Sequence, residues 1–431
     1  MGAFEARLSM RDRSGGRAPL AAFDIGAGKI SCLIAAAPAD AAHAVDILGT
    51  GSMALRHGDV SADTRVRLLR VAADQALRMA GDVMPAFATA YSGPDLVTTR
   101  AIGVIRIRKG EIAPRDVIAA INAARATADL DGRRLLHAQP VGYSIDDQEP
   151  IMDPRGLPGQ ELAAEVCLVH APAEAVAEAE ALIVQAGFAG PAFTVAGPFA
   201  AGHAVLTAEE REAGAVVIDL GEGGAGIAVF QDGVIRHAET VPGGGARLTL
   251  DLAARLKTTF AVAERAKLAH GGLSGDFDSG EAIEVPVLGA DGRLEQGVAL
   301  RGAFTEALLP RLEEIFEGIA ARLAAADVPG GPDALGVALT GGVSLTPGIR
   351  QIAHRILKRP VRLAHPTGFA GFDNGAACAS YALATGVLRC GFERLTAARP
   401  APARQRAETP AIRVGGGEVV TQAVAWIKEN F

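Results

Sequence analysis

One short pattern occurs twice in this chain of 431 residues and limits its possible folds more than any other feature. Residues 24–28 (DIGAG) and 219–223 (DLGEG) both read D-x-G-x-G, and each copy lies between two apolar runs of strand character. A glycine-rich turn between two such runs is typical of a β-hairpin. One copy alone would indicate an ordinary hairpin turn. Two copies far apart in the chain, followed by a Thr-Gly-Gly segment between a strand and a helix, form a more specific combination.

The chemistry of these turns favours a phosphate-bearing ligand. Glycine turns expose backbone N–H groups that can hold phosphate oxygens. Asp24 and Asp219 stand directly before the turns, where each could hold a hydrated Mg²⁺, since that ion keeps several waters and needs few carboxylates. A third glycine device, Thr340-Gly341-Gly342, leads from a predicted strand to a predicted helix and leaves room for a flat ring system.

Composition excludes several other classes of protein. The formal net charge is −7, which argues against a nucleic-acid partner because such proteins usually carry a basic stripe. The four cysteines are scattered without a C-x-x-C pair, so neither a zinc site nor a disulfide framework is indicated. No apolar run reaches the ~20 residues of a membrane-spanning helix, and the N-terminus lacks the apolar core of a signal peptide. We expect the body of the protein in the cytoplasm.

Outside the hairpins, composition divides the chain into distinct segments. Residues 93–170 combine a β-rich segment, a helix and two further strands, which predicts a compact α/β module. Amphipathic helices are expected at 64–81 and 304–323. Residues 1–19 are polar and rich in Gly and Arg, which predicts a disordered leader. Residues 395–417 have the Pro, Ala, Arg and Gly composition of a flexible linker.

The last fourteen residues, 418–431, form an amphipathic pattern when placed on a helical wheel. Such a helix is about 21 Å long, too short to cross ~30 Å of hydrocarbon but suited to lie in a membrane surface. A terminal helix packed on the protein's own core is the alternative, and the long linker before it favours the membrane. The predicted lipid contacts are Val420, Val424, Trp426, Ile427 and Phe431.

The two hairpins and the T-G-G loop resemble the actin, Hsp70 and sugar-kinase superfamily, in which two related α/β domains close on ATP. Further segments narrow the resemblance to the FtsA family of bacterial cell-division proteins. It runs in order from about residue 20 to the end, and the module at 93–170 is its most discriminating part. The segments that carry it include RLLHAQPVGYSIDD, GLPGQELAAEVCLV, GPFAAGHAVLTAEERE, AERAKLAHGG and VALTGGVSLTPGI.

The resemblance implies an α/β, actin-like two-domain ATPase fold with an inserted α/β module, subdomain 1C, and a C-terminal amphipathic helix. Subdomain 1C is expected at 93–170 and subdomain 2B at 246–299. The remaining segments are divided between two larger subdomains: 20–92, 171–209 and 366–394 form 1A, and 210–245 and 300–365 form 2A.

The same resemblance implies an ATP-binding adaptor that polymerises on the inner face of the cytoplasmic membrane at the division site. There it would anchor FtsZ filaments, bind lipid through 418–431 and recruit later division proteins through 93–170. FtsZ contacts would lie in the 246–299 lobe. The alternatives are another actin-like scaffold, of the pilus-assembly type, or a sugar or acetate kinase on the same fold.

The nucleotide contacts implied by the resemblance fall into four groups. Asp24 and Asp219 would also hold Mg²⁺ through water. Glu264 and Lys267 would bond ribose hydroxyls or ring nitrogens, unless they form only a solvated helical charge pair. The first phosphate loop comprises Asp24, Gly26, Ala27, Gly28 and Lys29; the second comprises Asp219, Gly221, Glu222, Gly223 and Gly224; the adenosine loop comprises Gly341, Gly342 and Val343; and the flanking helix supplies Glu264 and Lys267.

Three departures from the family pattern weaken the expected ATPase activity. Residues 224–226 read Gly-Ala-Gly where the family usually has Thr-Thr-Asp, and Gly28 stands where a serine is common. Residues 196–198 are Ala-Gly-Pro, where hydrolytic relatives place a Gln or Glu that orients the attacking water. We therefore predict no catalytic residue, and nucleotide binding with slow hydrolysis at best.

Overall fold

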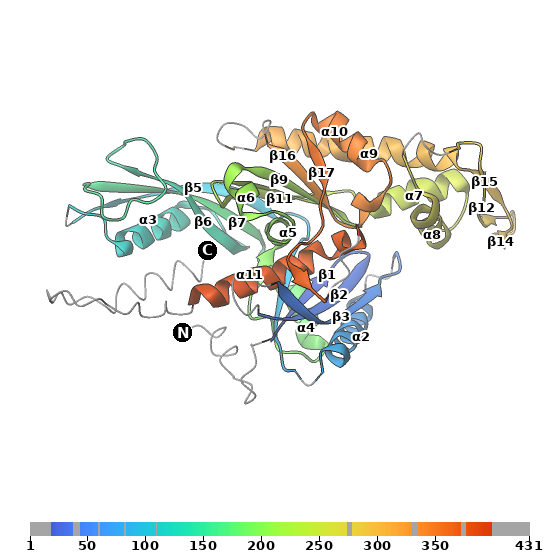
Figure 1. The fold of residues 1–431 in the computed structure, drawn as a ribbon, viewed down its shortest axis with the longest axis horizontal. Coiled ribbons are helices and arrows are strands. Elements are labelled where there is room, and N and C mark those ends of the chain that lie inside the picture. Colours follow the sequence, from blue (N-terminus) through green and yellow to red (C-terminus); the bar gives the residue numbers. More distant parts are fainter. Residues whose placement is uncertain are drawn as a thin grey trace.

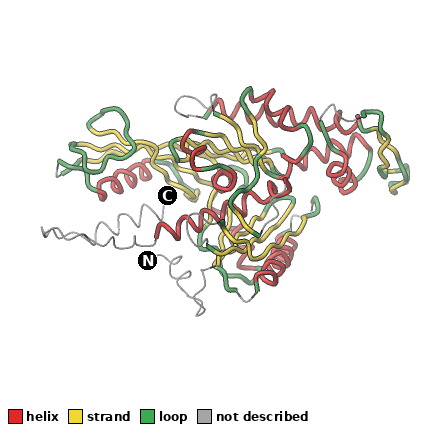
Figure 2. The backbone as a smooth tube through the Cα atoms, viewed as in Figure 1, coloured by secondary structure: helices red, strands yellow, loops and turns green. Residues whose placement is uncertain are grey.

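The structure is a computed structural model (Figure 1). Helices and strands alternate along the chain and assemble into two α/β bodies, with a smaller α/β module at one end (Figures 1 and 2). Outside the described residues lie the predicted leader before residue 19 and the predicted linker after residue 398. The predicted membrane helix, with its five lipid-contact residues, also lies outside them. Those described are 19–37, 44–58, 61–81, 83–108, 110–273, 278–326, 328, 335–371 and 376–398.

The first body is built on a six-stranded sheet in the order β18-β3-β2-β1-β4-β8. β1 and β2 pair antiparallel around the turn 26–28, so the first predicted hairpin is confirmed. β1 also pairs with the parallel strand β4, and its side chains from Leu20 to Phe23 are fully buried. The strands are β1 (Pro19–Ile25), β2 (Lys29–Ala36), β3 (Val45–Ala54), β4 (Ala86–Tyr91), β8 (Thr194–Ala196) and β18 (Phe369–Ala370).

Helix α2 (Ala62–Ala80) covers one face of this sheet, close to the range predicted from its periodicity. Two glycines of β3 allow the close approach. A Cβ atom on Gly51 would lie 1.9 Å from the backbone oxygen of Ala72, and one on Gly49 would lie 2.0 Å from that of Ala76. The helix therefore rests on the backbone of the strand. Helix α4 (Ala173–Gln185) also contacts α2.

The second body is built on a five-stranded sheet in the order β11-β10-β9-β16-β17. β9 and β10 pair antiparallel around the turn 221–223, which confirms the second hairpin. β9, β16 and β17 run parallel, so their carboxyl ends meet at one edge. The strands are β9 (Ala215–Leu220), β10 (Gly224–Gln231), β11 (Val234–Pro242), β16 (Gly336–Thr340) and β17 (Val361–Leu363).

Four helices pack against one another and against this second sheet in one apolar cluster. Helix α9 contains the predicted 304–323 helix, and α7 and α8 precede it in the chain. Two short strand pairs lie beyond α8 at the far end of the molecule (Figure 1). The helices are α7 (Gly245–Leu256), α8 (Phe260–His270), α9 (Gly302–Ala325) and α10 (Ile349–Leu357); the short strands are β12 (Ala282–Glu284), β13 (Val287–Leu288), β14 (Leu294–Glu295) and β15 (Val298–Leu300).

Two helices join the bodies. Helix α5 (Gly197–Val205) packs on β9 and β10, whereas α11 (Ala382–Ala398) packs on β1 and β4. They cross closely, since a Cβ atom on Gly386 would lie 1.9 Å from the backbone oxygen of Ala200. One apolar cluster therefore runs from the first sheet through both helices into the second. Helix α11 reaches Ala398, four residues into the range predicted as linker.

The module predicted at 93–170 has its own sheet, in the order β5-β7-β6, and its own apolar cluster against helix α3. It lies at one end of the molecule (Figure 1). Its elements are β5 (Val97–Arg106), α3 (Pro114–Thr127), β6 (Arg133–Ile145) and β7 (Glu161–Pro172).

The module covers the outer edge of β11. The hydroxyl of Thr98 accepts a hydrogen bond from Ala238 N (2.7 Å) and donates one to Ala238 O (2.8 Å). Ile235 N donates to the side-chain oxygen of Gln139 (2.8 Å). An exposed strand edge presents unpaired N–H and C=O groups. These bonds satisfy part of that edge and tie the module to the second body.

We expect Gly51→Ala to destabilise the protein by about 1–3 kcal/mol, because the added methyl group overlaps the backbone of α2. Gly318→Ala is the matched control, since a Cβ atom there meets no atom within 4 Å. Within helix α9 that change should stabilise by about 0.5–1 kcal/mol. Urea unfolding of both variants measures the difference. Equal midpoints for the two variants would contradict the close helix-on-strand packing.

Candidate functional site

The two glycine turns share the same internal hydrogen bond and face each other. Gly26 N donates to Lys29 O (2.9 Å), and Gly221 N donates to Gly224 O (2.9 Å). A Cβ atom added to Gly223 would lie 3.1 Å from the Cβ of Ala27. The structure therefore brings together the two D-x-G-x-G copies that the sequence separates.

Two carboxylates and one ammonium group lie at the base of the turns. Burial raises the pKa of Asp24, and the charge of Lys29 opposes that effect. Burial, followed by the charge of Asp24, raises the pKa of Asp219 to about 7. Burial lowers the pKa of Lys29, against the attraction of both carboxylates. The three charges therefore lie close enough to affect one another.

Lys29 reaches a segment that sequence reasoning missed. Its Nζ donates to the backbone oxygen of Ser380 (2.5 Å), lies 3.3 Å from the Ser380 hydroxyl, and stands 3.8 Å from the centre of the Tyr381 ring. Both residues belong to the short 3-10 helix η3 (Ala376–Tyr381), directly before α11. No motif or spacing in the sequence marks these two residues, because the contact joins segments about 350 residues apart.

The Thr340-Gly341-Gly342 segment lies beside the second turn. β16 pairs with β9 in a register that places Thr340 next to Asp219. Gly341 has φ +90°, and a Cβ atom there would lie 2.5 Å from Asp219 Oδ1. A Cβ atom on Gly342 would meet no atom within 4 Å, so the backbone there lies beside open space.

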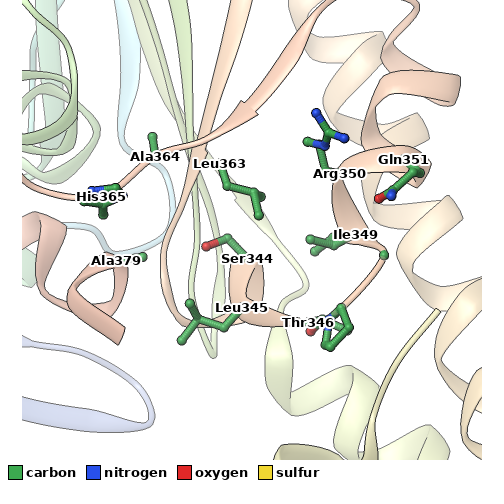
Figure 3. A pocket seen from close by; sticks show the side chains of 12 residues that line it. Ser344, Leu345, Thr346, Ile349, Arg350, Gln351, Leu363, Ala364, His365 and Ala379 are labelled. Carbon is green, nitrogen blue, oxygen red and sulfur yellow. The ribbon is translucent and has the colours of Figure 1, made fainter. Parts of the chain in front are cut away.

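A shallow cavity of about 290 Å³ continues from this loop. It lies between the 3-10 helix η2 (Gly342–Leu345), the start of α10, the end of β17 and η3 (Figure 3). Ser344 and Thr346 lie on one side of it, and His365 and Ala379 on another (Figure 3). The lining thus combines polar and charged side chains with apolar ones such as Leu345, Ile349 and Leu363.

The predicted pair on α8 is anchored to α7. Lys267 Nζ lies 2.7 Å from Glu264 Oε2 and donates to Thr249 Oγ1 (2.7 Å) and to Gly245 O (3.2 Å). Thr249 also bonds Glu264. The Lys267 side chain is only 10% exposed, so a freely solvated charge pair does not describe this geometry.

At two further positions that depart from the family pattern, Gly224 and Gly197, neighbouring atoms leave no space for a side chain. A Cβ atom on Gly224 would lie 2.4 Å from Val241 O, so a larger side chain there requires β11 to shift. A Cβ atom on Gly197 would lie 1.6 Å from the Ser92 hydroxyl. The segment that would orient an attacking water is buried and has no proton-accepting side chain. Within the described part of the chain, no group of three or more His, Cys, Asp or Glu side chains is placed to hold a metal ion.

Comparison with known proteins identifies the family. A sequence profile described as "Cell division protein FtsA" matches residues 216–386, and a profile described as "SHS2 domain inserted in FTSA" matches residues 93–170. The Cell division protein FtsA of Neisseria meningitidis serogroup B is 31% identical over 417 residues, which cover 96% of this chain and 98% of that protein. The chain belongs to the FtsA family.

Other FtsA proteins give similar agreement. The FtsA of Pseudomonas aeruginosa is 31% identical over 376 residues, covering 86% of this chain and 88% of that protein. The FtsA of Escherichia coli K12 is 29% identical over 391 residues, covering 86% and 89%. The sequence resemblance and the α/β, actin-like two-domain fold are therefore confirmed, and the protein is an actin-like member of a cell-division family.

The fold is also shared with a pilus protein. A chain of a solved PilM-PilN type IV pilus biogenesis complex matches this FtsA-family chain with a TM-score of 0.57, covering 88% of this chain and 99% of that one. Its sequence is only 15% identical, so the match shows the fold alone. The pilus-assembly alternative is not favoured over FtsA.

Among the helices that the structure describes, none has the length and apolar character needed to cross a bilayer.

The raised pKa of Asp219 predicts a pH-dependent stability. Between about pH 4 and 7 the folded carboxyl is protonated while the unfolded one is ionised, so this group makes stability fall as pH rises. Asp219→Asn should remove that fall and raise the Tm at pH 8 by roughly 2–4 °C relative to wild type, with little difference at pH 4.

Asp74→Asn, at an exposed position of α2, is the control and should behave like wild type at every pH. Thermal unfolding without nucleotide or divalent cations measures the series. Parallel Tm–pH curves for wild type and Asp219→Asn would show that the pKa of Asp219 is not raised in the folded protein.

Proposed function

We propose that this FtsA-family protein binds ATP with Mg²⁺ between its two glycine turns and acts as a membrane-bound, filament-forming adaptor in cell division. The main support is the pair of facing turns with the same internal hydrogen bond, next to the open space at Gly342. A ligand between the turns would contact both bodies at once. Nucleotide binding would thereby set the relative position of the two domains.

Each group of residues has a role in this proposal. Backbone N–H groups of the turns would hold phosphate oxygens, and the adenine would lie beside Gly342. Glu264 and Lys267 would bond the ribose. Asp24 and Asp219 would hold the water shell of Mg²⁺, which supplies positive charge next to the phosphates. Since the segment before α5 has no group to orient a water, ATP would serve mainly as a conformational ligand.

The adaptor role extends beyond the nucleotide site. We propose that the protein lies on the cytoplasmic face of the cell membrane at the division site, held by residues 418–431. One short helix binds lipid weakly, but many helices in one filament bind strongly. FtsZ would contact the 246–299 lobe, where Leu268 and Val298 are 75% and 66% exposed. Later division proteins would contact the inserted module at 93–170.

We expect Gly342→Leu to weaken binding of a fluorescent ATP analogue at least about tenfold, because the side chain fills the proposed adenine space. Gly318→Leu is the matched control, since that position is equally open but lies in α9. Titration at equal protein concentration gives both Kd values. Unchanged affinity in Gly342→Leu, with its Tm preserved, would refute the adenosine site.

We expect the full chain to sediment with vesicles of anionic phospholipid, and the chain lacking 418–431 to stay in the supernatant. Trp426→Glu should reduce sedimentation at least about tenfold in apparent Kd, because it places a charge in the apolar stripe. Gln422→Glu adds the same charge on the polar side and is the matched control. Equal sedimentation of the Trp426 and Gln422 variants would contradict the anchor.

Co-sedimentation of FtsZ tests the adaptor role in the same assay. FtsZ should pellet with vesicles only when the full chain is present, and ATP should increase the amount. A chain that binds vesicles but leaves FtsZ in the supernatant would refute this part of the proposal.

A further inference from the structure

The side chain of Glu222 lies between the two glycine turns and the start of α7. A Cβ atom on Gly28, in the opposite turn, would lie 2.7 Å from Glu222 Cγ. A Cβ atom on Gly245, the first residue of α7, would lie 2.6 Å from Glu222 Oε2 and 3.1 Å from a methyl carbon of Val343. Glu222 thus touches the first turn while its carboxylate reaches the adenosine side of the site.

The surroundings of the Glu222 carboxylate disfavour its charge. It lies beside Gly245 at the start of α7, but the first N–H groups of that helix donate to backbone oxygens of Gly221, Glu222 and Gly244. Burial raises the pKa of Glu222, whereas the charges of Lys267 and His57 oppose that rise and Glu264 adds to it. No described residue donates a hydrogen bond to the Glu222 carboxylate, since Lys267 bonds Glu264, Thr249 and Gly245 instead.

The turn itself does not need a glutamate. The corresponding position of the first D-x-G-x-G copy is Ala27, and that turn makes the same internal hydrogen bond as the second. The bodies also meet at a second point near the site, where the ring of His57, after β3, stacks on that of Phe260, at the start of α8, with 3.8 Å between centres. Glu222 is therefore an addition to a complete turn, and it lies where the two bodies touch.

We propose that Glu222 is an internal anion that occupies the phosphate end of the nucleotide site and must leave it before ATP binds. This inference rests on the proposed nucleotide site. The carboxylate and a phosphate group cannot share the space between Gly28 and Gly245, and their like charges repel. Nucleotide binding is consequently weakened by the energy needed to move Glu222 away from its contact with the first turn.

The test compares wild type, Glu222→Ala and Glu222→Gln by titration with ATP and, separately, with adenosine. Glu222→Ala copies the first turn and should bind ATP at least about tenfold more tightly than wild type. Glu222→Gln removes the charge but keeps the size, so its affinity should lie between the two. Adenosine lacks phosphates, so its affinity should change less than twofold. Glu149→Ala, at an exposed position of the module, is the control and should match wild type.

The possible outcomes separate this inference from the proposed function. Equal ATP affinity in wild type and Glu222→Ala would overturn the role of Glu222 while leaving the nucleotide site intact. A gain for adenosine as large as that for ATP would also overturn it, since the block would not be at the phosphate end. If no variant binds ATP at millimolar concentration while each keeps its Tm, the nucleotide site itself is refuted.

Discussion

The meeting of the two glycine turns is the contact on which the rest of this structure depends. Each turn closes with a hydrogen bond between its first glycine and the residue that begins the next strand, at Lys29 and Gly224. This closure directs both turns toward the same gap. The sheets behind them are held in place by one apolar cluster that passes through α5 and α11. A movement of either turn therefore changes the contact between the two bodies.

Three contacts join segments that lie far apart in the chain. Lys29 joins the first turn to η3 and so to α11, the last element that the structure describes. Thr98 and Gln139 join the inserted module to the edge of β11. Glu222 joins the second turn to the first. These contacts join the first turn to α11, the module to the second body, and the two turns to each other.

Much of the fold and part of the site follow from local sequence patterns. Apolar runs around 26–28 and 221–223 predict both hairpins, and periodicity predicts α2, α9 and the module, because such patterns depend on neighbouring residues. Ser380 and Tyr381 could not be predicted as partners of Lys29, since no spacing rule links residues so far apart. The hydrogen bond from Lys267 to Thr249 could not be predicted either, because it depends on how α8 packs against α7.

The sequence by itself determined the two turns, the order of α and β segments and the family, because turn formation and residue periodicity are local properties. The tertiary structure alone decided which groups face each other. It placed Asp219 where burial and Asp24 raise its pKa, left Gly342 beside open space, and set Glu222 between the turns. Those properties depend on desolvation and on distances across the two bodies, which exist only after the sheets have packed through α5 and α11.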